Sequence, residues 1–312
     1  MLLQIDIVRL GFSIIAAFAG FLILLELVSR WFLGLGNPLI YRADDAMGYV
    51  LAPNQRSRRF SNRVEINEYS MRSRSISRER PTDTLRILLL GDSIVNGAWW
   101  TDQDQTISSL LEKQLQPHYQ KIEVLNASAN SWGPRNQLAY LKHHGTFGAQ
   151  IVILLMNTDD LASGIPNSQI VGKDWNYPDH KPFLALEELY QRYIQKKAFV
   201  NKLPDPGDRI AINLQAVGEI QTIVKDNDSL FLLAITPLIR EVQERPKPFD
   251  TKSRERLATF VKNQNISFLD FLPLFMTDDA PATLYRDNIH ITSKGNEIVS
   301  GELYKLIQEN YR

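Results

Sequence analysis

The sequence lacks cysteine altogether, and its charges are balanced. The absence of cysteine among 312 residues excludes disulfides, thiolate nucleophiles and cysteine-based zinc sites. Lysine and arginine number 35, as do aspartate and glutamate, so the formal net charge is zero. This balance gives no electrostatic attraction for nucleic acid, and we expect no nucleic-acid partner. The sequence also holds no glycine-rich phosphate loop, dinucleotide fingerprint, internal repeat or metal-ligand spacing, so we expect no cofactor and no metal.

Charged residues are also missing from a long stretch near the amino terminus. None occurs from residue 10 to residue 25, and with two charges tolerated the apolar stretch reaches about Leu35. About 20 such residues cross the hydrocarbon core of a bilayer. We therefore expect residues 1–35 to form a transmembrane anchor that contacts membrane lipid through residues 10–35. A cleaved signal peptide is the alternative, but the stretch is long for one and no small-x-small cleavage site follows it.

A short apolar run further along the chain ends in a turn that carries a serine. Residues 85–90 have the length and branched composition of a buried strand, and Gly91 then frees the backbone to turn sharply. Asp92 and Ser93 follow, at the end of the strand beyond which open α/β sheets bind their ligands. Ser93 is thus a candidate nucleophile, although Asp92 and Ser93 could equally do no more than cap the next helix.

An aspartate and a histidine lie in one turn just ahead of the last helix. Two residues separate Asp287 from His290, and an amphipathic stretch then completes the chain. A serine hydroxyl is a weak nucleophile until a base takes its proton, and a carboxylate that fixes the tautomer of that base improves it. Asp287 and His290 supply both groups. The remaining histidines are expected at the surface: His118, His143, His144 and His180.

The Gly-Asp-Ser motif after the strand and the Asp-x-x-His motif before the last helix together resemble the SGNH, or GDSL, hydrolase family. The resemblance covers about residues 85–312 and implies that Ser93 is the nucleophile, His290 the base and Asp287 its orienting acid. The leucine that follows the serine in the family is replaced here by Ile94. The family fold is a three-layer α/β/α sandwich with a parallel five-stranded sheet, of flavodoxin-like type.

The pattern of the remaining chain independently favours an α/β fold. Apolar runs of strand length lie at 85–90, 122–125, 150–156, 230–236 and 266–271. Helical stretches alternate with them, at about 105–115, 134–147, 183–200, 209–226, 251–265 and 296–311. Such alternation implies a parallel sheet covered on both faces. We expect residues 36–84 to be a linker with a short hairpin between residues 60 and 77, and residues 85–312 to be the catalytic domain.

The loop after the second strand contributes to the oxyanion hole in the family, through a backbone N–H group. Counted from Asn126, the family spacing points to Ser131, whereas residue type points to Gly133. A backbone donor needs no particular side chain, so either residue could serve. The backbone N–H of Ser93 is the other expected backbone donor.

The loop after the third strand carries an asparagine in the family, whose side chain donates to the oxyanion. By residue type this is Asn157, but by distance from the strand start it is Asp159. An ionised carboxylate cannot donate a hydrogen bond. An oxyanion hole with Asp159 in this place would lack one donor, at a cost of about 10²–10³ in rate. This is the clearest departure from the family pattern.

Two further features point to the substrate. The long irregular loop 162–182 follows the third strand, where such loops are often functional, and we expect it to shape substrate choice. Trp99 and Trp100 follow the nucleophile and either stack on sugar rings or fill the core.

These observations predict a serine esterase that cleaves a small ester or an acylated glycan. The expected substrate is an O-acetyl group on a cell-envelope or exported glycan. One alternative is an O-acyltransferase that uses the same triad, and another is a non-catalytic envelope binding or assembly protein on a hydrolase scaffold, which Asp159 favours.

Two considerations on the orientation of the anchor point in opposite directions. A strict positive-inside count places the bulk of the protein in the cytoplasm, because Arg9 precedes the span alone and several arginines follow it. Large domains cross membranes regardless of that bias. Anchored proteins similar to this one act outside the cytoplasm, so we expect a single-pass protein with an extracytoplasmic catalytic domain.

Overall fold

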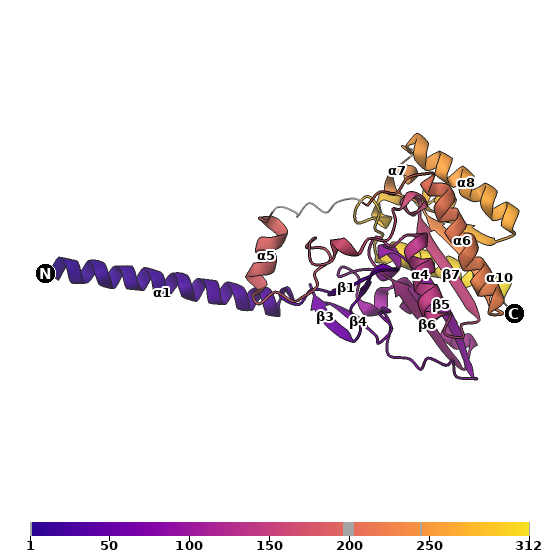
Figure 1. Ribbon diagram of the computed structural model, residues 1–312. Helices are drawn as coiled ribbons and strands as arrows, with labels where there is room; N and C mark the ends of the chain where they lie inside the picture. The colour runs from indigo at the N-terminus through magenta and orange to yellow at the C-terminus, as the bar shows by residue number, and fades with distance from the viewer. Residues whose placement is uncertain (1, 196–202, 244, 312) are drawn as a thin grey trace.

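The computed structural model describes residues 2–195, 203–243 and 245–311, with side chains from residue 9 onward. A long helix, α1 (Leu2–Trp31), projects away from a body built on one central sheet (Figure 1). Within α1, Arg9–Trp31 is long and apolar enough to cross a membrane, and no part of its most apolar window is buried in the body. Such a helix is typical of a membrane anchor or a signal sequence.

The central sheet has five strands in the order β6-β5-β7-β8-β9, and every neighbouring pair is parallel. In chain order the strands are β5 (Thr84–Gly91), β6 (Lys121–Ser128), β7 (Ile151–Asn157), β8 (Leu230–Thr236) and β9 (Ser267–Asp270). The expected parallel five-stranded sheet is therefore confirmed.

Helices cover both faces of this sheet, as expected for a three-layer sandwich. The core on one face includes α4 (Pro134–His144), α6 (Arg209–Asp226) and α8 (Pro248–Gln264). The core on the other face includes α2 (Ser93–Asn96), α3 (Ile107–Leu115), α7 (Ile239–Val242), α9 (Leu272–Met276) and α10 (Ser293–Asn310). Helix α5 (Ala185–Tyr193) lies apart from both layers, beside the end of α1 (Figure 1).

The central strand β5 shows why a continuous apolar run forms the middle of the sheet. All its residues are buried, and successive side chains enter opposite cores. Leu88 and Leu90 pack in the core under α4 and α6, whereas Ile87 and Leu89 pack in the core under α3 and α10. A strand buried on both faces has no polar face, which explains why its sequence does not alternate.

Residues 36–84 differ from the expected linker with one hairpin between 60 and 77. They form two antiparallel hairpins, β1 (Tyr41–Asp44) with β2 (Gly48–Leu51), and β3 (Gln55–Arg59) with β4 (Asn62–Ile66). The expected hairpin thus begins earlier, because three arginines and a glutamine in β3 conceal its alternation. Side chains from both hairpins, such as Tyr49 and Val64, are buried in the same core as β5.

Several element ends also differ from the sequence prediction. Strand β6 continues to Ser128, which pairs with Gly91 of β5, so the start of the expected loop after it is strand. Helix α4 ends at His144, and α8 and α10 each begin three residues earlier than expected, at Pro248 and Ser293. Of the helix expected at 183–200, the structure has α5, and residues 196–200 lie outside the described part of the chain.

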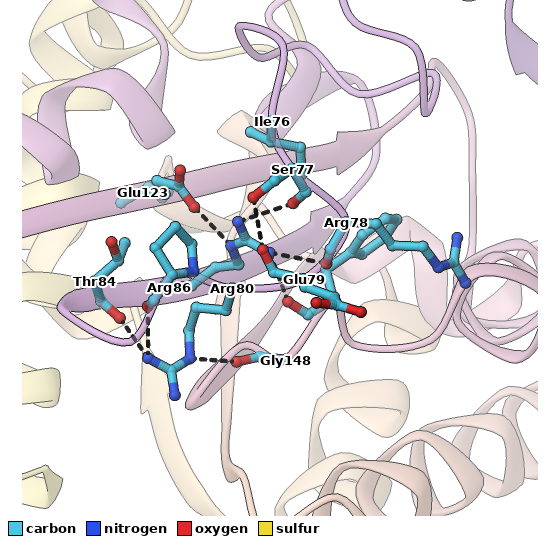
Figure 2. A network of polar contacts seen from close by, with 12 residues as sticks. Ile76, Ser77, Arg78, Glu79, Arg80, Thr84, Arg86, Glu123 and Gly148 are labelled. Carbon is cyan, nitrogen blue, oxygen red and sulfur yellow. Dashed lines mark hydrogen bonds and ion pairs between the residues drawn. The ribbon is translucent and has the colours of Figure 1, made fainter.

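One buried charge fixes the start of the sheet. The Arg86 side chain is fully buried, and its guanidinium donates to the carboxylate of Glu123 at 2.6 Å. It also donates to the backbone oxygens of Ser77 and Arg78 (Figure 2). A further bond goes to the backbone oxygen of Phe147. Because these bonds use most of its donors, Arg86 ties the segment before β5 to the end of the sheet opposite the strand carboxyl ends.

Candidate active site

Ser93 lies in a tight turn between β5 and the short helix α2. A Cβ atom added to Gly91 would lie 2.2 Å from a methyl carbon of Val95, so only glycine fits where the strand turns. The Asp92 carboxylate accepts a hydrogen bond from the Ile94 N–H at 2.8 Å and caps α2. The capping role considered from the sequence therefore belongs to Asp92, and the Ser93 hydroxyl points to another partner.

Asp287 and His290 lie in a closed turn before α10. Tyr285 and Ile291 pair as an isolated antiparallel bridge on either side of the turn. Inside it, the Asp287 carboxylate accepts hydrogen bonds from the backbone N–H groups of Ile289 at 3.0 Å and His290 at 2.9 Å. These bonds fix the carboxylate against its own backbone and beside the imidazole ring.

The fold brings these two distant segments together in one chain of hydrogen bonds. The Ser93 Oγ is 2.9 Å from His290 Nε2. On the far side of the ring, Nδ1 is 2.8 Å from Asp287 Oδ2 and 3.0 Å from Oδ1. Burial alone would raise the pKa of Asp287, but the hydrogen bonds from His290 and Ile289 outweigh it and lower that pKa. An ionised carboxylate, an imidazole and a hydroxyl in this order can transfer a proton away from the serine.

Asn157 ends β7, the strand beside β5, and is the centre of a second network. Its side-chain N–H donates to Asp92 Oδ2 at 2.8 Å. Its backbone N–H donates to Asp160 Oδ2 at 2.9 Å, and its side-chain oxygen accepts from the Asp159 N–H at 2.7 Å. Burial raises the pKa of Asp160 well above its usual range, and the nearby Asp92 carboxylate adds to this. Burial likewise raises the pKa of Asp92.

Asp159, the other residue considered for the oxyanion position, has a different partner. Its carboxylate accepts a hydrogen bond from Arg240 of α7 at 3.0 Å, and its side chain is 44% exposed. Arg240 also pairs with Asp250 at 2.7 Å. The structure thus places Asn157 against the turn that holds Ser93 and directs Asp159 toward α7.

In the part of the chain described, no group of three histidine, aspartate or glutamate side chains could hold a metal ion.

The two candidate oxyanion donors in the loop after β6, Ser131 and Gly133, have different hydrogen-bond partners. Ser131 has a φ of 58°, in the left-handed region, and its Oγ accepts a hydrogen bond from the Tyr177 hydroxyl at 2.9 Å. Its backbone N–H has no acceptor among the described residues. The Gly133 N–H instead donates to the side chain of Asn136 at 3.0 Å. A Cβ at Gly133 would lie 1.8 Å from Ser163 Oγ, so this glycine is required for close packing.

The hairpin β1–β2 holds this loop in place, which the sequence did not indicate. The Tyr49 hydroxyl donates to the Asn130 backbone oxygen at 2.6 Å, and the Trp132 indole N–H donates to the Tyr49 backbone oxygen at 2.9 Å. The rings of Tyr41, Tyr49 and Tyr177 pack edge to face, with centroids 4.9–5.9 Å apart. No local pattern marks these tyrosines, because their partners lie far away in the chain.

A hollow of about 240 Å³ opens beside His290. Trp99 and Trp100 line it and are half-buried, so they lie at the rim of the site rather than in the core. The Trp100 ring centroid is 4.5 Å from that of His290, and the Arg286 guanidinium lies 4.5 Å from the centre of the Trp100 ring. Loop 162–182 also contributes to the wall of the hollow.

Several solved structures match most of this chain at TM-scores below 0.5. TesA is 15% identical with a TM-score of 0.48, over 72% of this chain and 98% of that chain. The acetyl xylan esterase AlAXEase is 11% identical with a TM-score of 0.47, over 71% and 99%. The esterase EstA from Pseudoalteromonas sp. is 16% identical with a TM-score of 0.46, over 72% and 97%. No match was found among curated protein sequences.

The sequence itself matches one protein family. Residues 89–298, more than half of the chain, match the GDSL-like lipase/acylhydrolase family. This match begins within β5, includes the turn with Ser93 and ends in α10 after the turn with Asp287 and His290. The protein therefore belongs to the GDSL-like lipase/acylhydrolase family and is a serine ester hydrolase.

Proposed function

We propose that the esterase acts through Ser93, His290 and Asp287. The observation that carries this proposal is the unbroken chain of hydrogen bonds from the Ser93 hydroxyl through the His290 ring to the Asp287 carboxylate, at 2.9 and 2.8 Å. A nucleophile, a base and an orienting group at these distances have the geometry that acyl transfer requires.

In the proposed reaction the Ser93 oxygen attacks the ester carbonyl carbon while its proton passes to His290 Nε2. The tetrahedral intermediate collapses as His290 returns that proton to the departing alcohol oxygen, which leaves an acyl group on Ser93. His290 then takes a proton from water, whose oxygen attacks the acyl carbonyl. Collapse of the second intermediate releases the carboxylic acid, and the proton returns to Ser93.

The oxyanion hole follows from the donors that are free of other partners. We assign it to the backbone N–H groups of Ser93 and Ser131, neither of which has an acceptor among the residues described. The Asn157 amide uses one N–H on Asp92 and has a second for the oxyanion. Gly133 and Asp159 are excluded from this assignment because the N–H of one and the carboxylate of the other are engaged elsewhere.

The proposed substrate is an O-acetyl group on a glycan. The hollow beside His290 is small, and the half-buried indole rings of Trp99 and Trp100 at its rim offer apolar faces on which a sugar ring can pack. Helix α1 would hold the enzyme in a membrane as a single-pass anchor, with the body outside the cytoplasm where envelope glycans lie. The exposed apolar surface of α1 supports the anchoring role.

A serine-reactive phosphonate tests the central role. Wild type and Ser131→Ala should be labelled, because in both the Ser93 hydroxyl is intact, whereas Ser93→Ala should not. Equal labelling of Ser93→Ala would remove Ser93 from the role.

A second experiment measures acetate release from an acetylated glycan, with and without an added glycan acceptor. Release of acetate indicates hydrolysis, and acetylation of the acceptor indicates transfer. Glycan binding by wild type without any turnover would favour a binding protein.

A further inference from the structure

The two charges near the end of the apolar helix α1 hold helix α5. The Glu26 carboxylate accepts hydrogen bonds from the backbone N–H groups of Ala185 at 2.8 Å and Leu186 at 3.0 Å, the first residues of α5. Arg30 pairs with Glu26 and donates to the Phe183 backbone oxygen just before α5. The first N–H groups of a helix lack acceptors within the helix. Glu26 supplies acceptors for two of them and so caps α5 from another helix.

The side of α5 that faces the body is bonded to it through Glu188. Glu188 is buried and pairs with Arg59 of β3 through both of its carboxylate oxygens. It also accepts from the Gly36 N–H at 2.8 Å and from Arg192 at 2.8 Å. Because α5 is bonded both to α1 and to β3, its direction relative to α1 is set by the fold.

The outer face of α5 and the end of α1 expose large apolar side chains. Ala185, Glu188 and Arg192 recur at helical spacing on the face toward the body, which places Tyr190 and Ile194 on the opposite face. We name the exposed group the junction patch, and it consists of Trp31, Phe32, Phe183, Tyr190, Tyr193 and Ile194. Phe183, Trp31 and Tyr193 are more than 80% exposed, at 87%, 82% and 81%.

Elsewhere in the described body, large apolar side chains are less exposed than those of the junction patch. Leu184, next to Phe183, is exposed to a smaller extent than the patch, and so are Phe60, Ile165, Phe249 and Met276. A concentrated apolar patch on an otherwise polar surface indicates an interaction site. Tryptophan and tyrosine are the residues enriched where protein meets the membrane–water interface.

The position of the patch indicates which partner covers it. The patch continues the exposed apolar surface of α1, whose most apolar window has no buried residue. In Figure 1, α5 runs crosswise beside the base of α1, as a helix lying in a membrane surface does beside one that crosses it. Arg58, exposed on β3 next to Gly34, adds a positive charge where lipid headgroups would lie.

We propose that α5 is an interfacial helix that lies in the surface of the membrane into which α1 inserts. This proposal rests on the anchor proposed above. Arg192 of α5 also lines the hollow beside His290, so docking of α5 would place that hollow close to the lipid surface. Esters at the membrane surface would then reach Ser93 more readily than esters free in solution.

Single-cysteine labelling of the full chain tests this, because the natural sequence has no other thiol. The label is an environment-sensitive fluorophore, and the protein is reconstituted in phosphatidylcholine–phosphatidylglycerol vesicles with or without brominated lipid as quencher. Phe183→Cys and Tyr193→Cys report on the junction patch. Phe18→Cys reports on the middle of α1, and Ala258→Cys on exposed α8 is the control.

Labels at Phe183→Cys and Tyr193→Cys should lose most of their emission with bromine near the headgroups. The label at Phe18→Cys should lose its emission when the bromine lies deep in the acyl chains. The label at Ala258→Cys should keep its emission with bromine at either depth. Quenching at Phe18→Cys without quenching at the patch keeps the anchor but overturns the interfacial helix. No quenching at Phe18→Cys overturns the anchor and the proposal with it. Patch labels that are shielded equally in detergent and in lipid, and are insensitive to bromine, would reveal a protein partner and overturn the proposal.

Discussion

The side-chain amide of Asn157 donates a hydrogen bond to the carboxylate of Asp92 at 2.8 Å, and so joins the carboxyl ends of β7 and β5 beside Ser93. Asp92 caps the helix that begins at Ser93. A change at Asn157 therefore acts both on the turn that holds Ser93 and on the second amide N–H that we assign to the oxyanion hole.

Replacing Asn157 with alanine should lower kcat by about 10²–10³, the usual cost of one lost oxyanion donor. Asp159→Asn is the matched control and should keep kcat within a few-fold, because it changes only a half-exposed ion pair with Arg240. Aryl acetate hydrolysis measures both, and phosphonate labelling of Asn157→Ala shows whether Ser93 is still active. A larger loss in Asp159→Asn than in Asn157→Ala would reverse the assignment.

Replacing Asp287 with asparagine should lower kcat by at least about 10², and by up to the 10⁴ seen for such changes in other triads. Asp287 Oδ2 is the closest acceptor for His290 Nδ1–H. An amide nitrogen in that place favours the tautomer with its proton on Nε2, which donates to Ser93 instead of accepting from it. Asp278→Asn, which loses only an ion pair with Lys294, is the control. Full activity in Asp287→Asn would contradict the proposed role.

The buried Asp160 should make the stability of the fold depend on pH. The pKa of Asp160 is raised in the folded state. At any pH between the pKa of this group in the unfolded chain and its pKa in the folded protein, the folded protein binds more protons than the unfolded chain. The free energy of unfolding therefore falls as pH rises from about 4 through the folded pKa. Asp160→Asn has no such proton, and its Oδ1 can still accept from Asn157.

Urea unfolding at several pH values measures this effect. The stability of Asp160→Asn relative to wild type should increase as pH rises from about 4, whereas Asp279→Asn, at an exposed position, should follow wild type. A difference between Asp160→Asn and wild type that stays constant from pH 4 to 8 would count against a raised pKa at Asp160.

Replacing Arg86 with methionine should destabilise the fold by about 3 kcal/mol, because it leaves Glu123 and several buried backbone oxygens without a donor. Arg74→Met removes an exposed arginine paired with Glu112 and should cost no more than about 1 kcal/mol. Thermal or urea unfolding of the two variants compares the costs. Equal stability of both variants would show that Arg86 does not fix the start of the sheet.

Part of the site could be predicted because its signals are local. The apolar run that becomes β5, the glycine after it and the serine beyond are consecutive, so the strand, the turn and the place of Ser93 follow from neighbouring residues. Asp287 and His290 are close in sequence, and one turn suffices to bring them together. Strand β3 has no such local signal, because its arginines carry no apolar alternation, although Arg59 is buried against Glu188.

Residues that are neighbours along the chain are enough to predict the alternation of strands and helices from β5 onward, the apolar character of α1 and the residue types available for catalysis. Tertiary packing is what turns Asn157 toward Asp92 and Asp159 toward Arg240. The same packing brings Tyr49 to the loop after β6 and Glu26 to the start of α5. These contacts join segments far apart in the chain, and a contact of this kind exists only after the segments have packed together.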